Sequence, residues 1–99
     1  MKIEYRDKQN LKQVEKDDSL DGMLPTGVGK SFRKKINFIK GTLNEGDIVA
    51  WQSLRYEKLK GERKGQKSIR LNDQWRLIFE TADGEDPKFI VLGFEDYHD

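Results

Sequence analysis

Two runs of alternating apolar and polar residues, separated by a short turn, constrain the fold of this chain more than any other feature. Residues 66–71 and 75–80 both alternate with the period of a β-strand, so they predict the two arms of a hairpin. A two-residue turn between them would mix apolar and polar side chains on each face. A three-residue turn at 72–74 instead places Leu71 opposite Trp75 and gives one continuous apolar face. We therefore predict the three-residue turn.

The same register has a consequence for the polar face of the hairpin, where it places Arg70 opposite Arg76. Like charges in directly opposite positions repel each other, so an anion bound between the two arginines would relieve a real cost. The alternative is that both side chains simply point into water.

The remaining segments predict helices first and strands afterwards. Residues 2–6 alternate like a short strand, and Asp7 is a suitable N-cap for a first helix. A second helix is expected from about Gly29, with Gly46 and Asp47 at its end. Its apolar stripe consists of Phe32, Ile36, Ile39 and Leu43.

The last strand is expected over residues 88–94, after a turn at Asp83-Gly84. The predicted order is then β-α-α-β-β-β. Helices followed by an antiparallel sheet indicate the α+β class, and 99 residues are enough for a single domain spanning 1–99.

Composition excludes several classes of function. The chain has no cysteine and one histidine, and its acidic residues show no ligand spacing, so we expect no disulfide, metal site or cofactor. No apolar stretch is long enough for a membrane span or a signal peptide, and we expect a cytoplasmic protein. The glycines before Lys30 do not make a nucleotide-binding loop, because Leu24 stands where that motif needs glycine.

The net charge of +1 hides an uneven distribution. Residues 30–70 hold 12 Lys/Arg and 4 Asp/Glu, whereas residues 71–99 hold 2 and 8. A basic middle of this size is typical of a protein that binds phosphate backbones. A solvated helix face and loop would give the same count, so charge alone leaves both interpretations open.

Two further segments carry candidate chemistry. The glycine-flanked turn at 59–65 holds Lys60, Arg63 and Lys64, and lysine and arginine beside turn amides form common phosphate sites. A charged surface loop is the alternative. The C-terminal run of Asp96, Tyr97 and His98 can supply the proton transfers of RNA cleavage by a neighbouring 2′-hydroxyl, with the arginines stabilising the phosphate. Taken alone, a terminal histidine is more often a solvated end.

These motifs, in this order, resemble a known family. The run Leu59-Lys60-Gly61, then residues 65–79 with the sequence Gly-Gln-Lys-Ser-Ile-Arg-Leu-Asn-Asp-Gln-Trp-Arg-Leu-Ile-Phe, then Asp96-Tyr97-His98, is similar to the HigB branch of the RelE/ParE toxin superfamily. The detailed likeness covers about residues 54–98, half of the chain.

The resemblance implies a toxin of a type II toxin-antitoxin system. Such toxins are ribosome-dependent endoribonucleases that cleave mRNA in the ribosomal A site, and a helix-turn-helix antitoxin, HigA-like, holds them inactive. The implied fold is a twisted antiparallel β-sheet packed against two N-terminal helices. The site residues that the resemblance implies are Lys60, Arg70, Arg76, Asp96, Tyr97 and His98. We predict that Arg76, His98, Asp96, Tyr97 and Arg70 are catalytic, and that Lys60 binds RNA together with Arg63, Lys64 and Glu57.

The sequence departs from the family pattern at one position. Some HigB toxins carry a catalytic histidine where this chain has Glu57. Glutamate can act as a base but repels phosphate, so we expect weak cleavage, or a shift of proton transfer to His98 and Asp96.

Two other functions fit the same sequence. The superfamily also contains ParE-like toxins that inhibit DNA gyrase without an enzymatic step, and a small basic domain can also bind RNA without being toxic. The acid/base tail favours the nuclease.

Overall fold

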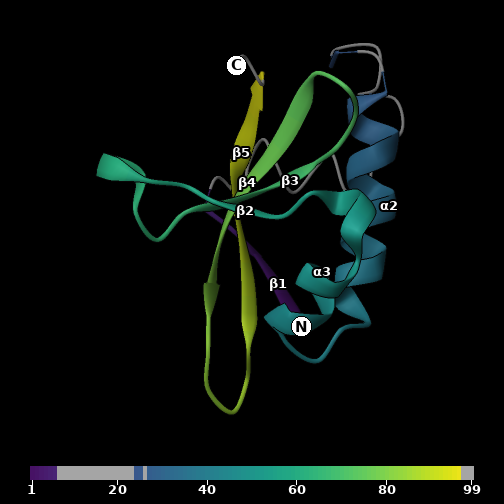
Figure 1. The fold of residues 1–99 in the computed structure, drawn as a ribbon. Helices are drawn as coiled ribbons and strands as arrows, with labels where there is room; N and C mark the ends of the chain where they lie inside the picture. The colour runs from purple at the N-terminus through teal and green to yellow at the C-terminus, as the bar shows by residue number, and fades with distance from the viewer. Residues whose placement is uncertain (7–23, 26, 97–99) are drawn as a thin grey trace.

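A computed structural model describes residues 1–6, 24–25 and 27–96 of the chain (Figure 1). Its helices and strands are β1 (Lys2–Tyr5), α2 (Val28–Lys40), α3 (Glu45–Ala50), β2 (Glu57–Lys58), β3 (Lys67–Arg70), β4 (Trp75–Ala82) and β5 (Lys88–Asp96). Short 3₁₀ turns, η2 (Gln52–Leu54) and η3 (Gly61–Arg63), lie on either side of β2. This arrangement confirms the α+β class. The helix expected from Asp7 lies outside the described residues, and no helix within them is long and apolar enough to cross a membrane.

The five strands form one sheet in the order β1-β5-β4-β3-β2. Neighbours from β5 to β2 are antiparallel, whereas β1 runs parallel to β5, with Lys2 opposite Lys88 and Tyr5 opposite Val91. A parallel pair needs a long connection between its strands, and here most of the chain, including α2 and α3, supplies it.

The predicted hairpin register is confirmed. Ile69 is paired with Leu77 and Arg70 with Arg76, and the N–H of Leu71 donates to the carbonyl of Trp75. This register puts Ile69 and Leu77 on the face that meets the helices. The other face carries Ser68, Arg70 and Arg76, with Ile78 buried among them.

The core lies between α2 and this apolar face. Figure 1 shows α2 alongside the sheet. Four residues of α2 are completely buried: Val28, Phe32, Ile36 and Ile39. The last three belong to the predicted apolar stripe, which is confirmed at those positions. Each such side chain contributes about 1.5–3 kcal/mol by leaving water. The sheet supplies Ile69, Leu77, Phe79, Phe89 and Val91.

The predicted end of the second helix was wrong. Helix α2 stops at Lys40, and Leu43 is 80% exposed in the connection that follows. Gly46 and Asp47 lie inside α3, whose first turn is acidic and whose Asp47 carboxylate accepts a hydrogen bond from the Leu43 N–H at 2.9 Å. Acidic residues suit a helix N-terminus, so these residues start a helix instead of ending one.

A partly buried polar network fixes α3 to the sheet. The Glu45 carboxylate lies 2.7 Å from the Lys67 ammonium and accepts a 2.5 Å hydrogen bond from the Tyr56 hydroxyl. The Lys67 ammonium also donates to the Thr81 hydroxyl at 2.6 Å. Burial alone would raise the pKa of Glu45, but the bonds from Lys67 and Tyr56 outweigh it, and the pKa lies below its ordinary value of 4.5.

Replacing Glu45 with glutamine is expected to lower the free energy of unfolding at pH 7 by about 1–2 kcal/mol, because a charged partner is lost from a partly buried pair. A carboxylate whose pKa is lower in the folded state stabilises the fold above its unfolded pKa and loses that contribution as the pH falls. The wild type should therefore lose stability below about pH 4.5 more steeply than the Glu45→Gln variant. Urea unfolding at several pH values measures both effects, and Glu85→Gln, in an exposed turn, is the control. Parallel pH profiles for wild type and Glu45→Gln would contradict this assignment.

Candidate functional site

Arg76 of β4 is the best-anchored cation on the polar face of the sheet. It is only 6% exposed. Its Nε donates to the Ser68 hydroxyl at 2.8 Å, and its Nη2 donates to the backbone carbonyls of Arg55 and, at 3.3 Å, Ser68. A guanidinium stays charged at any physiological pH, and these acceptors are neutral, so the positive charge of Arg76 is fixed in place without being cancelled by them.

Arg55 presents its carbonyl to Arg76 from an unusual backbone conformation. It has φ 50° and ψ 54° and is the only residue other than glycine with positive φ in the described parts of the chain. It follows η2 as the C-cap, and its N–H donates to the Gln52 carbonyl at 3.0 Å. Its side chain is exposed.

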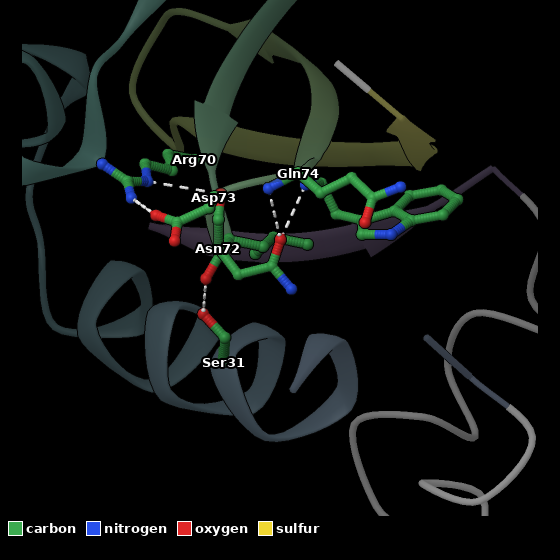
Figure 2. Close-up of polar contacts among 7 residues, drawn as sticks. Ser31, Arg70, Asn72, Asp73 and Gln74 are labelled. Carbon is green, nitrogen blue, oxygen red and sulfur yellow. Dashed lines mark hydrogen bonds and ion pairs between the residues drawn. The ribbon is translucent and has the colours of Figure 1, made fainter. Parts of the chain in front are cut away.

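Arg70, directly across from Arg76 in the ladder, does not point freely into water. Its Nε donates to the Asn72 carbonyl at 3.2 Å, and its Nη2 is paired with the Asp73 carboxylate, toward which it turns in Figure 2. Because Asp73 is 95% exposed, water screens this ion pair and it contributes little to stability.

The turn that carries Asp73 is held from two sides. The Asn72 side-chain oxygen accepts hydrogen bonds from the N–H groups of Gln74, at 2.9 Å, and Trp75, at 2.7 Å. Below it, the Ser31 hydroxyl of α2 donates to the Leu71 carbonyl (Figure 2). The end of the hairpin is therefore fixed to the helix layer.

Lys35 adds positive charge beside this turn. Its ammonium donates to the Ser31 hydroxyl at 2.9 Å. Burial, together with the positive charges of Lys34 and Arg70, lowers the pKa of Lys35. The region around Arg70 is therefore crowded with cations.

Two cavities have Arg76 in their lining. One, of about 210 Å³, is lined by Arg55, Arg70, Asn72, Asp73 and Arg76. The other, of about 200 Å³, is lined by Leu59, Arg63, Ser68, Arg76, Ile78, Glu95 and Asp96. The first holds three arginines and one carboxylate, whereas the second balances two arginines against two carboxylates.

Arg63 is tied to β5. Its Nη1 lies 2.7 Å from a Glu95 oxygen, its Nη2 contacts the other, and its Nε donates to the Gln66 side chain at 3.1 Å. The bonds to Glu95 raise the pKa of Arg63. Arg63 therefore lines the second cavity as half of an ion pair.

Lys60, Lys64 and Glu57 are exposed and line neither of the two cavities around Arg76. Glu57 is paired with Ser68 across β2 and β3, so it lies on the same face of the sheet as Arg76. Both lysines flank η3, in the segment that Figure 1 shows projecting from the sheet away from α2.

Asp96 ends β5 and lines the second cavity. It is paired with Trp75, and its Oδ2 accepts a hydrogen bond from the Gln74 side chain at 3.0 Å. The other two residues of the predicted tail, Tyr97 and His98, lie outside the described residues.

Sequence reasoning missed three residues of this site. Ser68 and Arg55 hold Arg76, and Glu95 lies across from Arg76 in the ladder between β4 and β5. The strand alternation that located Arg70 and Arg76 could have located Ser68 and Glu95. Nothing in the local sequence marks Arg55, because its place depends on the turn after η2.

Comparison with known proteins agrees with this architecture. Residues 3–98 match the model of the HigB-like toxin family, described as the RelE-like toxin of the type II toxin-antitoxin system HigB. The chain is 34% identical over 84 residues to Toxin HigB-1 of Vibrio cholerae, covering 85% of this chain and 87% of that protein.

Two solved structures share the fold at lower identity. A YoeB/ParE toxin from Agrobacterium tumefaciens is 17% identical, with a TM-score of 0.64, and the match covers 99% of this chain and 100% of that one. YafQ from E. coli strain BL21(DE3) is 19% identical, with a TM-score of 0.60, and the match covers 95% and 90%.

Proposed function

This chain belongs to the HigB-like family of RelE-like toxins from type II toxin-antitoxin systems, and on that premise we propose that it is a ribosome-dependent endoribonuclease. It would cleave mRNA in the ribosomal A site during translation and so stop growth.

The observation that carries this proposal is the setting of Arg76. Its guanidinium is held in advance by neutral oxygens and borders both cavities of the polar face. Cleavage by a 2′-hydroxyl builds negative charge on the phosphate in the transition state. A cation that is already oriented stabilises that charge without reorganising during the reaction.

The proton transfers fall to the C-terminal residues in this proposal. One group must take the proton of the 2′-hydroxyl and another must protonate the leaving 5′-oxygen. His98 is the only imidazole in the chain, and Asp96 lines the cavity beside Arg76, so we assign the transfers to this pair. Tyr97 would stack on a base or orient the hydroxyl.

The remaining predicted residues have supporting roles. Arg70 would share the phosphate charge with Arg76, and Lys60 and Lys64 would contact the RNA backbone from the η3 segment. Arg63 is the weakest of the predicted RNA ligands, because Glu95 already occupies its guanidinium. Glu57 lies on the same face of the sheet as Arg76, where its carboxylate would repel phosphate, which is why we expect weak cleavage.

The partners follow from the family. A type II toxin has a protein antitoxin, and we propose that here it is a HigA-like helix-turn-helix protein. The mRNA is the proposed substrate, the ribosome is a proposed partner, and the cytoplasm is the proposed location.

The test is mRNA cleavage in a purified translation system. Mapping of 5′ ends should show cuts at the codon in the A site, and the same mRNA without ribosomes should stay intact. Adding the antitoxin should prevent the cuts. Intact mRNA in the translation system, together with loss of gyrase supercoiling, would refute the nuclease and point to inhibition of gyrase.

A further inference from the structure

The cavity between Arg55 and Arg70 contains one arginine, Arg55, that the proposed chemistry does not use. Three guanidiniums border it, from Arg55, Arg70 and Arg76, against the single carboxylate of Asp73. That carboxylate is paired with Arg70 and is almost fully exposed. The cavity is therefore net positive, and the ammonium of Lys35 lies close enough to Arg70 for the two charges to repel.

The side chain of Arg55 has no structural task in the described parts of the chain. Its backbone carbonyl holds Arg76, but any residue type supplies a carbonyl. The left-handed conformation at this position costs an ordinary residue about 1 kcal/mol, whereas glycine adopts it freely. An exposed arginine thus occupies a position where glycine would cost the fold less, so a role for this residue has to come from its guanidinium.

The position of the cavity also matters. Arg76 borders both cavities, and Asp96 borders only the second one. The cavity with Arg55 is therefore distinct from the cavity that Asp96 lines, and Arg76 is common to both. A strand with its reacting phosphate at Arg76 would reach this cavity with a neighbouring nucleotide.

We propose that Arg55 forms a second subsite for one RNA backbone phosphate, next to the phosphate that Arg76 and Arg70 bind for cleavage. The subsite would fix the direction of the RNA strand across the sheet, from the Arg55 cavity past Arg76 toward Asp96. Guanidinium groups suit this task because they bind phosphate oxygens through two parallel hydrogen bonds. The identity of the ligand as RNA rests on the function proposed above.

The experiment compares the salt dependence of RNA binding in the wild type and four variants, without ribosomes. Fluorescence anisotropy measures the dissociation constant of a short, labelled single-stranded RNA over a range of salt concentrations. Arg55→Gly removes the guanidinium and preserves the backbone conformation. Arg55→Lys keeps the charge, and Lys2→Ala removes one charge from an exposed site on β1, at the far edge of the sheet.

Loss of one phosphate contact should make the slope of log K against log salt shallower by about 0.7 and weaken binding at low salt roughly tenfold. We expect both changes in Arg55→Gly, neither in Lys2→Ala, and recovery of the slope in Arg55→Lys. Arg55→Asn, which also tolerates this conformation, should repeat the glycine result and guards against a folding defect in one variant.

Equal slopes for wild type and both Arg55→Gly and Arg55→Asn would overturn the subsite. So would undetectable RNA binding by the wild type, or a loss of antitoxin affinity with the RNA slope unchanged, since the cavity would then bind protein. The outcome is separate from that of the nuclease test. If the wild type leaves mRNA intact on ribosomes but Arg55→Gly makes the salt slope of RNA binding shallower, the subsite is supported and the proposed function is refuted.

Discussion

Replacing Arg76 with alanine is expected to reduce mRNA cleavage on the ribosome by about 10²–10³-fold, because a preoriented cation facing the charge of the transition state is lost. The change should appear in the cleavage rate more than in the affinity for ribosomes, since only the transition state carries the extra charge. Single-turnover cleavage of a defined mRNA measures it. A rate within threefold of wild type would remove Arg76 from the catalytic site.

Arg76 also has a structural role, and two control variants separate the two contributions. Alanine leaves the carbonyls of Arg55 and Ser68 without this donor, which is expected to lower the free energy of unfolding by about 1–3 kcal/mol. Ser68→Ala removes the acceptor of the Nε but keeps the charge, so it should lose much less activity. Arg76→Lys keeps the charge and loses the planar guanidinium, and we expect an intermediate rate.

Replacing His98 with glutamine is expected to reduce cleavage by about 10²-fold or more, because positioned acid/base groups contribute roughly 10²–10⁴-fold. An imidazole ordinarily gains or loses its proton near neutral pH, and His98 is the only histidine of the sequence. The wild type should therefore show a rate that changes between about pH 5 and 8, and the variant should lose that change. The measurement is the rate of ribosome-bound cleavage across this range.

Two further variants test whether the effect belongs to His98. Tyr97→Phe keeps the ring and removes the hydroxyl. A cleavage rate only a few-fold lower would agree with stacking, whereas a loss as large as that of His98→Gln would assign a proton transfer to Tyr97. Glu57→His restores the histidine found in some HigB toxins and is expected to raise the rate. If His98→Gln has the activity and pH profile of the wild type, proton transfer must be assigned elsewhere.

The parts of the fold that depend on local sequence pattern could be predicted. The register of β3 and β4 could be predicted because only one turn length keeps Leu71 and Trp75 on one face. The pairing of β1 with β5 could not, since Lys2 and Lys88 become neighbours only through the packing of the whole chain. Strand β2 was missed because its two residues are exposed and carry no apolar alternation.

The candidate site divides in the same way. Alternation along β3 and β4 places Arg70 and Arg76 opposite each other, as predicted. The hydrogen-bond and ion-pair partners of these two arginines could not be predicted from the sequence. Arg70 turns to Asp73 within its own turn, whereas Arg76 is buried because Arg55, from a segment without clear periodicity, brings a carbonyl to it. The partner of Arg63 is equally distant in sequence, because Glu95 belongs to the last strand.

The parallel pairing of β1 with β5 has a consequence for how a newly made molecule becomes active. Contacts between segments far apart in the sequence form late in folding, because a long loop must close before they yield any stabilisation. Of the described strands, β5 is the last to leave the ribosome, yet it lies between β1 and β4 in the sheet. The ladder that carries Arg76 and Asp96 can therefore assemble only after residue 96 has been synthesised. An antitoxin already present in the cell has that interval in which to meet a toxin whose site is still incomplete.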